Sequence, residues 1–275
     1  MLGMTTQAVS QLVAELESIL GFRVFNRTTR RVGLTQDGEA LLERAVALVA
    51  DTEELEQRFR PQAQALSGRL RVDLPSRIAR RQVAPALPTF FEQHPGIELD
   101  LGSSDRAIDL VHEGIDCALR VGELPSSSLV AQPLGTFRLI NCASPAYLAR
   151  HGVPRTPADL PRHLAVNYAT PNYGRAAAWE WEEHGRLQTL TMRAQVSANN
   201  AETYIACCLA GLGLIQIPAF DVREHLEAGE LVEVLPGWAA PAMPVQIVYP
   251  HRRHLSRRVR AFNGWLAQVL APCLA

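Results

Sequence analysis

The stretch that decides the fold lies near the start of the chain and reads Thr5-Thr6-Gln7-Ala8-Val9-Ser10-Gln11-Leu12-Val13-Ala14-Glu15-Leu16-Glu17. Its apolar residues repeat with the spacing of one helical face and continue past the quoted stretch, as Val9, Leu12, Val13, Leu16, Ile19 and Leu20. Small polar side chains occupy the opposite face. Thr5 suits the N-cap, and Gly21 suits a left-handed stop after the last turn. The pattern predicts a helix with one face for a domain core and one face of hydrogen-bonding side chains.

The segment that follows this helix reads as two short strands joined by a basic turn. Phe22 to Phe25 alternates as strands do, and Val32-Gly33-Leu34 is apolar again. Between them lies the polar run Asn26-Arg27-Thr28-Thr29-Arg30-Arg31. Arginines at a loop tip suit DNA phosphates and a narrow minor groove. A solvated turn is the ordinary alternative, but a polar helix face followed by a basic wing favours DNA recognition through the major groove.

From Leu2 to Leu42 the chain resembles the winged helix-turn-helix of LysR-type transcriptional regulators. The motifs that carry this resemblance are Ala8-Val9-Ser10, Leu16-Glu17, Leu20-Gly21, Phe25, Arg27, Arg30 and Leu34-Thr35-x-x-Gly38. The similarity continues through the chain in Asp105-Arg106, Glu113-Gly114, Asp116, Leu119-Arg120-Val121-Gly122, Ser127-Ser128-Leu129-Val130, Ala143-Ser144-Pro145-x-Tyr147-Leu148, Gly211-Leu212-Gly213 and Pro218. The resemblance implies a bacterial, cytoplasmic regulator that binds double-stranded promoter DNA and a small-molecule effector. It also implies a homodimer or homotetramer that contacts RNA polymerase.

The predicted DNA-binding residues lie on the polar face of the helix and on the wing. We expect Gln7, Ser10 and Gln11 to read base edges, with Thr6 at the edge of that face. Phosphate or minor-groove contacts are expected from Thr5, Arg27, Thr29, Arg30 and Arg31. Paired helices of a dimer would then enter successive major grooves of an interrupted palindrome.

The chain departs from the family pattern at its start. A first helix and most of a second precede the position that Leu2 matches in the family, whereas only Met1-Leu2-Gly3-Met4 precedes Thr5 here. At about 25 cal/mol per Å² of apolar surface, the missing packing amounts to several kcal/mol. Two interpretations stay open. Either the start was assigned too late, which we favour because Ser10 and Arg27 still fit their roles, or the chain is a truncated effector-binding module with impaired DNA binding.

A long helical pattern begins near Gln36. Its seam steps by four and three residues through Leu41, Ala45, Leu48, Thr52, Leu55, Phe59 and Gln62. The resemblance implies a linker helix that pairs with its mate in a dimer, and packing within one subunit is the alternative. Pro61 is expected to end this helix, so residues 61–68 read as a hinge.

From Arg69 onward, strand patterns alternate with helical ones, which predicts a mostly parallel sheet. Strands are expected at 70–74, 97–101, 115–120, 138–142, 192–196, 214–217 and 245–249. Helices are expected from near Gln82 to Gln93 and at 105–113, 145–151, 200–210 and 255–270. The predicted fold class is α+β and multidomain: a truncated winged helix-turn-helix (1–35), a linker helix and hinge (36–67), and a two-lobed α/β effector domain (68–275). By resemblance this domain is similar to type 2 periplasmic binding proteins, with lobe I at 68–135 and 243–275 and lobe II at 136–242.

The candidate effector site follows from the ends of the predicted strands. Ligands of open α/β sheets bind beyond the carboxyl ends of strands, and helix starts there favour an anion. The polar and turn-forming residues at these positions are Ser76, Arg77, Ser103, Ser104, Gly122, Asn199, Asn200 and Pro218. We expect a small organic carboxylate anchored by Ser76, Ser103 and Asn199, with Arg77 as a further candidate.

Ordinary structural roles are the alternatives for these residues. Ser103, Ser104 and Asn199 would serve equally as helix caps, and Ser76 and Arg77 as solvated loop residues. Asp105 is expected to be an N-cap or a structural pairing residue.

Composition narrows the class of protein. The chain has 275 residues, is 47% hydrophobic and 20% charged, and has a net charge of −1, so it is globular and its DNA-binding case rests on the local wing. We see no apolar run of membrane-spanning length and no signal-peptide pattern, which agrees with a cytoplasmic protein. The cysteines Cys117, Cys142, Cys207, Cys208 and Cys273 show no metal-ligand spacing, so free thiols and no metal are expected.

Two other classes of protein fit the sequence less well. A hydrolase needs a nucleophile with a base and an orienting group, and no such motif is visible, so we expect no enzyme, no catalytic residues and no cofactor. A pure solute-binding protein would explain two lobes, but it would leave the N-terminal helix and the wing unexplained.

Overall fold

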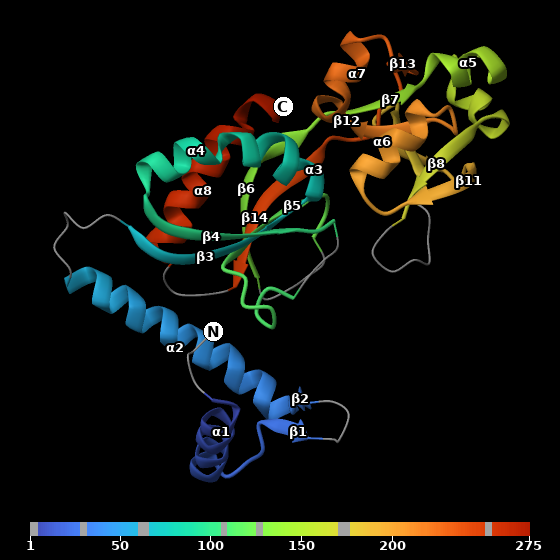
Figure 1. Ribbon diagram of the computed structural model, residues 1–275. Coiled ribbons are helices and arrows are strands. Elements are labelled where there is room, and N and C mark those ends of the chain that lie inside the picture. The colour runs from blue at the N-terminus through green and yellow to red at the C-terminus, as the bar shows by residue number, and fades with distance from the viewer. Residues whose placement is uncertain are drawn as a thin grey trace. The chain divides into compact units, whose positions relative to one another are not determined.

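The computed structural model describes residues 5–27, 32–59, 66–105, 109–124, 129–169, 177–250 and 255–275. Two compact units divide the chain after Gln64, with the short stretch 252–256 grouped with the first unit (Figure 1). The predictions made for Thr29, Arg30, Arg31, Pro61 and Gln62 fall outside the described residues.

The first unit contains the predicted helix and wing. Helix α1 (Thr6–Leu20) begins at the Thr5 cap, whose hydroxyl accepts a hydrogen bond from the Ala8 amide at 3.3 Å, and ends at Gly21 with φ +77°. Both predicted ends of the helix are therefore confirmed. Strand β1 (Phe25–Arg27) pairs antiparallel with β2 (Val32–Leu34), and helix α2 (Gln36–Phe59) follows. The first strand begins later than predicted because the Val24 amide binds the Glu17 side chain instead of a strand partner.

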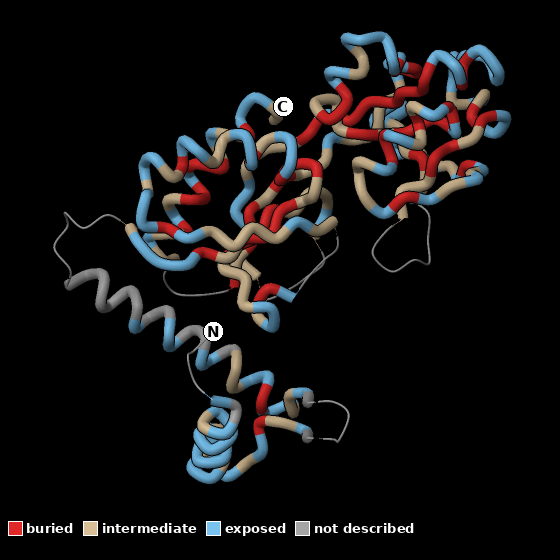
Figure 2. The backbone as a smooth tube through the Cα atoms, in the orientation of Figure 1, coloured by how far each residue is buried: buried red, intermediate tan, exposed pale blue. Residues whose placement is uncertain are grey.

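The apolar stripe of α1 is largely exposed in this structure (Figure 2). Val9 is 39% exposed, Leu12 52%, Leu16 41% and Ile19 83%. The predicted role of these four side chains in a domain core is therefore not observed within the described residues. On α2, Leu48 is 66% exposed as well, so the predicted seam presents an apolar side chain to solvent.

The second unit has two α/β lobes, and lobe I is built on a five-stranded sheet. The sheet order is β4 (Gly96–Ser103), β3 (Ser67–Leu74), β5 (Cys117–Val121), β14 (Met243–Pro250) and β6 (Leu129–Phe137). Pairs of β3 with β4 and β5 are parallel, whereas β14 is antiparallel to both of its neighbours. The predicted mostly parallel sheet is wrong here, because β14 returns from lobe II and enters the sheet in the opposite direction.

Two long helices cover one face of this sheet (Figure 1). These are α4 (Ala84–Gln93) and α8 (Arg257–Leu270), and η4 (Ala271–Cys273) follows α8. The aromatic rings of Phe90, Phe262 and Trp265 join them, with centroids 5.1–5.6 Å apart. This aromatic cluster fixes the helical layer on which the lobe I end of the candidate site is mounted.

The helical segment after β3 starts earlier than predicted. Helix α3 (Ser76–Ile78) runs into a π-helical turn, η1 (Ala79–Val83), and then into α4. In the π turn the Ala84 amide bonds to the Ala79 carbonyl, which restarts the helix so that Pro85 falls in its first turn. A helix expected at 105–113 is not observed either, since residues 109–114 form turns and 106–108 lie outside the described residues.

Lobe II combines a three-stranded sheet with a separate parallel pair. The sheet order is β12 (Ile215–Pro218), β7 (Leu139–Ala143) and β13 (Val232–Val234), all antiparallel. Strand β8 (Leu164–Tyr168) pairs parallel with β11 (Arg193–Ala198), and β9 (Trp179–Glu183) forms a hairpin with β10 (Arg186–Leu190). The helices are α5 (Pro145–His151), η2 (Pro157–Arg162), α6 (Ala201–Leu209), η3 (Ala219–Val222) and α7 (Arg223–Glu227).

The cysteines are all free thiols, as predicted, and Cys117, Cys142 and Cys208 are buried. Burial raises the pKa of the Cys117 thiol, which keeps it protonated and unreactive. Within the described ranges, no helix is both long and apolar enough to cross a bilayer, and no cluster of His, Cys, Asp and Glu is arranged to hold a metal ion.

Candidate functional site

The polar face of α1 presents three of the predicted base-reading side chains to solvent. Gln7, Ser10 and Gln11 are exposed and lie at the spacing that places residues on one helical surface. Gln11 is within 3.5 Å of the Glu15 carboxylate. Thr5 is exposed too, and its hydroxyl serves as the helix cap. The side chains of Thr6 and Arg27 lie outside the described residues.

Glu17 ties the wing to this helix, a role that the sequence did not predict. One carboxylate oxygen accepts hydrogen bonds from the Val24 amide at 2.7 Å and the Phe25 amide at 3.1 Å. A charged acceptor that holds two backbone donors fixes the entry into β1 relative to the last turn of α1. The only sequence signal was the place of Glu17 in the Leu16-Glu17 motif.

Thr35 and Gly38 explain a second family motif. The Thr35 hydroxyl donates to the Arg23 carbonyl at 2.6 Å and accepts from the Gly38 amide at 2.9 Å, so it caps α2 and grips the chain before β1. A Cβ atom at Gly38 would lie 2.1 Å from the Val24 carbonyl oxygen. Glycine is therefore required for α2 to start this close to the wing.

In the second unit, an aspartate joins the two lobes at the predicted effector site. Asp105 follows β4 in lobe I, and its carboxylate accepts from the Ser76 amide at 2.7 Å and the Ser76 hydroxyl at 2.9 Å. The same carboxylate accepts from the amide of Ala201, which begins α6 in lobe II, at 3.2 Å. This arrangement confirms the expectation that Asp105 is a pairing residue.

Arg77 forms a second connection between the lobes. Its guanidinium lies 2.9 Å from Asp221 and 2.8 Å from Glu202, and the Arg77 and Asp221 side chains are only 7% and 8% exposed. Burial raises the pKa of Asp221 to about 7, although Arg77 opposes the shift. The alternative that Arg77 is a solvated loop residue is therefore wrong, and its charge is already balanced by carboxylates.

The other predicted effector residues surround this junction unevenly. Ser103 is exposed at the end of β4, and the Ser104 amide binds the Leu74 carbonyl at 3.0 Å. Asn200 caps α6 through the Thr203 amide at 2.9 Å and donates to Asn199 at 3.2 Å. The expected capping alternative thus falls on Asn200, directly beside Ala201.

Gly122 and Pro218 lie at strand ends, as predicted, but no described contact links them to Asp105. Gly122 has φ +94° and its amide binds the Pro244 carbonyl at 2.8 Å. Pro218 ends β12 and precedes η3. Their conformations explain why a glycine and a proline stand there without requiring a ligand.

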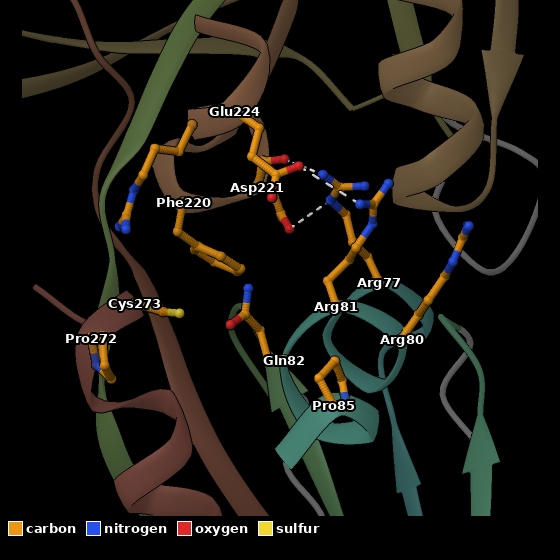
Figure 3. A pocket seen from close by; sticks show the side chains of 11 residues that line it. Arg77, Arg80, Arg81, Gln82, Pro85, Phe220, Asp221, Glu224, Pro272 and Cys273 are labelled. Atoms are coloured by element: carbon orange, nitrogen blue, oxygen red, sulfur yellow. Dashed lines mark hydrogen bonds and ion pairs between the residues drawn. The ribbon is translucent and has the colours of Figure 1, made fainter. Parts of the chain in front are cut away.

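A pocket of about 470 Å³ adjoins the Arg77 connection (Figure 3). Its lining residues come from η1, α4, η3, α7 and η4, and include Phe220 and Gln82 near its centre. Of the predicted effector residues, only Arg77 lines it. The pocket and the Asp105 junction are therefore two different places within the second unit.

Comparisons with known proteins agree across both units. Residues 1–39 match the model of the bacterial regulatory helix-turn-helix protein, lysR family, and residues 63–271 match the LysR substrate binding domain. The HTH-type transcriptional regulator YhjC of Escherichia coli K12 is 44% identical over 268 residues, covering 97% of this chain and 89% of that protein. An HTH-type transcriptional repressor of Pseudomonas aeruginosa UCBPP-PA14 is 38% identical, covering 98% and 85%.

Solved structures with the same architecture cover nearly the whole chain. CrgA, a LysR-type transcriptional regulator from Neisseria meningitidis, is 30% identical with a TM-score of 0.66 and covers 98% of this chain and 91% of that one. The full-length Vibrio cholerae virulence activator AphB is 28% identical with a TM-score of 0.63, covering 96% and 90%. These relatives are named as regulators, not enzymes. The chain belongs to the LysR family of DNA-binding transcriptional regulators, with an N-terminal helix-turn-helix region and an effector-binding domain.

Proposed function

We propose that this chain controls transcription in response to a small organic carboxylate bound between lobe I and lobe II. The observation that carries the proposal is the set of donors around Asp105: Ser76 in lobe I and Ala201 in lobe II both direct hydrogen bonds at one carboxylate. Donors from two lobes that hold a carboxylate supply the chemistry that an anionic effector needs.

Further residues complete the proposed effector site. Ser103 and Asn199 are proposed as additional anchors because both are exposed beside this junction in the sequence. The remaining predicted residues are proposed to line the cleft: Arg77, Ser104, Gly122, Asn200 and Pro218.

On the DNA side, we propose that Gln7, Ser10 and Gln11 read base edges while the wing arginines hold phosphates. The exposure of the three polar side chains supports this role. A homodimer or homotetramer that contacts RNA polymerase is proposed from family membership. The predicted divisions at 1–35, 36–67 and 68–275 are kept as part of the proposal.

One observation favours the second candidate, an effector-binding module with weak DNA binding. The apolar stripe of α1 is exposed, and Ile19 reaches 83%. A reading helix without a packed apolar face is held less firmly, which lowers DNA affinity.

Calorimetric titration of the full chain with a library of small carboxylates tests the effector proposal. We expect a member of the library to bind the wild type, and Ser103→Ala to lose about 5–10-fold in affinity through one lost hydrogen bond to a charged group. Ser18→Ala, an exposed serine of the first unit, is the matched control. Equal binding by wild type and Ser103→Ala would remove Ser103 from the site. The carboxylate that binds should also change the affinity for promoter DNA in fluorescence anisotropy.

A further inference from the structure

The contacts of Asp105 place one carboxylate at the starts of two helical segments from different lobes. Ser76 opens the continuous helical segment Ser76–Gln93 of lobe I, and Ala201 opens the nine-residue helix α6 of lobe II. Tyr168, at the end of β8 in lobe II, lies beside the same group. Burial raises the pKa of this phenol, and the Asp105 carboxylate raises it further.

The next residue on each helical segment repeats the connection with a direct ion pair. Arg77 follows Ser76, Glu202 follows Ala201, and their charged groups are 2.8 Å apart. Neighbouring positions in lobe I and lobe II are therefore joined twice, once through Asp105 and once directly. The direct ion pair does not use Asp105, so the lobes keep one connection when the Asp105 bridge is broken.

We propose that Asp105 is an internal latch that competes with the effector for the Ser76 donors. This inference rests on the proposed carboxylate effector. Two carboxylates cannot share the same backbone and hydroxyl donors without strong repulsion, so an incoming carboxylate displaces Asp105. Displacement also breaks the contact with the Ala201 amide. Effector occupancy is thereby converted into a change in how lobe I is attached to lobe II.

The latch makes Asp105 a determinant of effector affinity that the effector itself does not need. Removing its side chain frees the Ser76 amide and hydroxyl and the Ala201 amide while leaving Arg77 paired with Glu202. The latch therefore predicts a gain in carboxylate binding from a substitution that loses native hydrogen bonds. A purely structural role for Asp105 predicts only a loss of stability.

Thermal unfolding of full-length Asp105→Ala in sodium acetate or in sodium chloride of equal ionic strength tests the latch. Acetate is the probe because it supplies the missing carboxylate. In chloride the variant should unfold at a lower temperature than wild type. Acetate several-fold above its dissociation constant should raise the variant's midpoint by about 2–4 °C, with no acetate-specific shift in wild type. The matched control is Asp100→Ala, which removes a half-exposed aspartate paired with Arg69, and it should show no acetate-specific shift. Equal acetate responses in Asp105→Ala and wild type would overturn the latch.

A second variant covers the case in which Asp105→Ala does not fold. Asp105→Asn keeps the size of the side chain and removes its charge, and hydrogen exchange at residues 201–203 should be faster than in wild type. The carboxylate that binds wild type should bind Asp105→Asn about tenfold more tightly, since the repulsion is gone. Unchanged exchange, or equal affinity of wild type and variant, would exclude the latch while leaving the effector proposal standing. Acetate rescue of Asp105→Ala, with no carboxylate that alters DNA binding, would leave the latch standing and exclude the effector proposal.

Discussion

At the scale of single residues, Asp221 shows how burial governs a charge. Its side chain is 8% exposed beside Arg77, and Glu202 and Asp105 add negative charge nearby. The sequence did not single out Asp221, because its bond to Arg77 joins positions 144 residues apart and no local spacing signals such a pair. Arg77 itself was predicted as a site residue for its place after a strand, and that reasoning did not reveal its partners.

Asp221 should make stability depend on pH between about 4 and 7. Its pKa rises from an ordinary 3.8 to about 7 on folding. Below pH 4 both the folded and unfolded chains carry a neutral group, and as pH rises the unfolded chain ionises first, so the free energy of unfolding falls. Asp221→Asn removes this dependence. The difference in free energy of unfolding, variant minus wild type, should therefore increase by about 2 kcal/mol from pH 4 to pH 7 in urea titrations.

The control for this titration is the exposed Glu123→Gln, whose difference from wild type should stay constant across the range. A constant difference for Asp221→Asn as well would show that Asp221 does not resist ionisation in the folded chain.

At the scale of elements, predictions succeeded where both ends of a helix carried local signals. Thr5 and Gly21 bound α1 as predicted, since caps and left-handed stops depend on neighbouring residues alone. The segment at 76–93 failed because the rule for Pro85 assumed regular α-helical bonding, and the π turn before it altered that bonding. The direction of β14 was also missed, because strand direction depends on the path between lobes rather than on the strand's own residues.

The contact between α1 and the wing is an element-scale feature that a single substitution tests. Glu17→Ala leaves the Val24 and Phe25 amides without their acceptor, which should destabilise the first unit by about 1–3 kcal/mol. Promoter affinity should fall because the wing is no longer fixed against the reading helix, as measured by fluorescence anisotropy. Glu15→Ala is a close control, since it removes the same charge from the same helix. If the two variants lost equal affinity, charge rather than wing position would be the cause.

At the scale of the whole molecule, DNA binding has to come from local charge. The net charge is −1, so no global attraction draws the chain to DNA. Family membership followed from motifs spread along the chain, but the exposed stripe of α1 shows that a recognised motif does not by itself supply the packing around it. The effector cleft was predicted as a set of strand ends, whereas its internal carboxylate pairing became visible only in three dimensions.

The salt dependence of promoter binding should report the wing. Each phosphate contact contributes about −0.9 to the slope of log K against log salt, so replacing Arg27, Arg30 and Arg31 by serine should flatten the slope by about 3. Fluorescence anisotropy at several salt concentrations measures this change. Arg186→Ser in the β9–β10 hairpin of the second unit is the control and should leave the slope unchanged. An unaltered slope in the triple variant would remove the wing from the DNA interface.

The late arrival of β14 has a consequence for how the protein is made. This strand lies between β5 and β6, yet it is synthesised after all of lobe II (Figure 1). While the ribosome still holds residues 243–275, lobe II has every one of its strands, but lobe I has open edges on β5 and β6. Nascent chains are therefore exposed to mispairing at lobe I until the last moments of translation. A premature stop codon just before Met243 would spare almost nine-tenths of the gene and still leave a chain prone to aggregation.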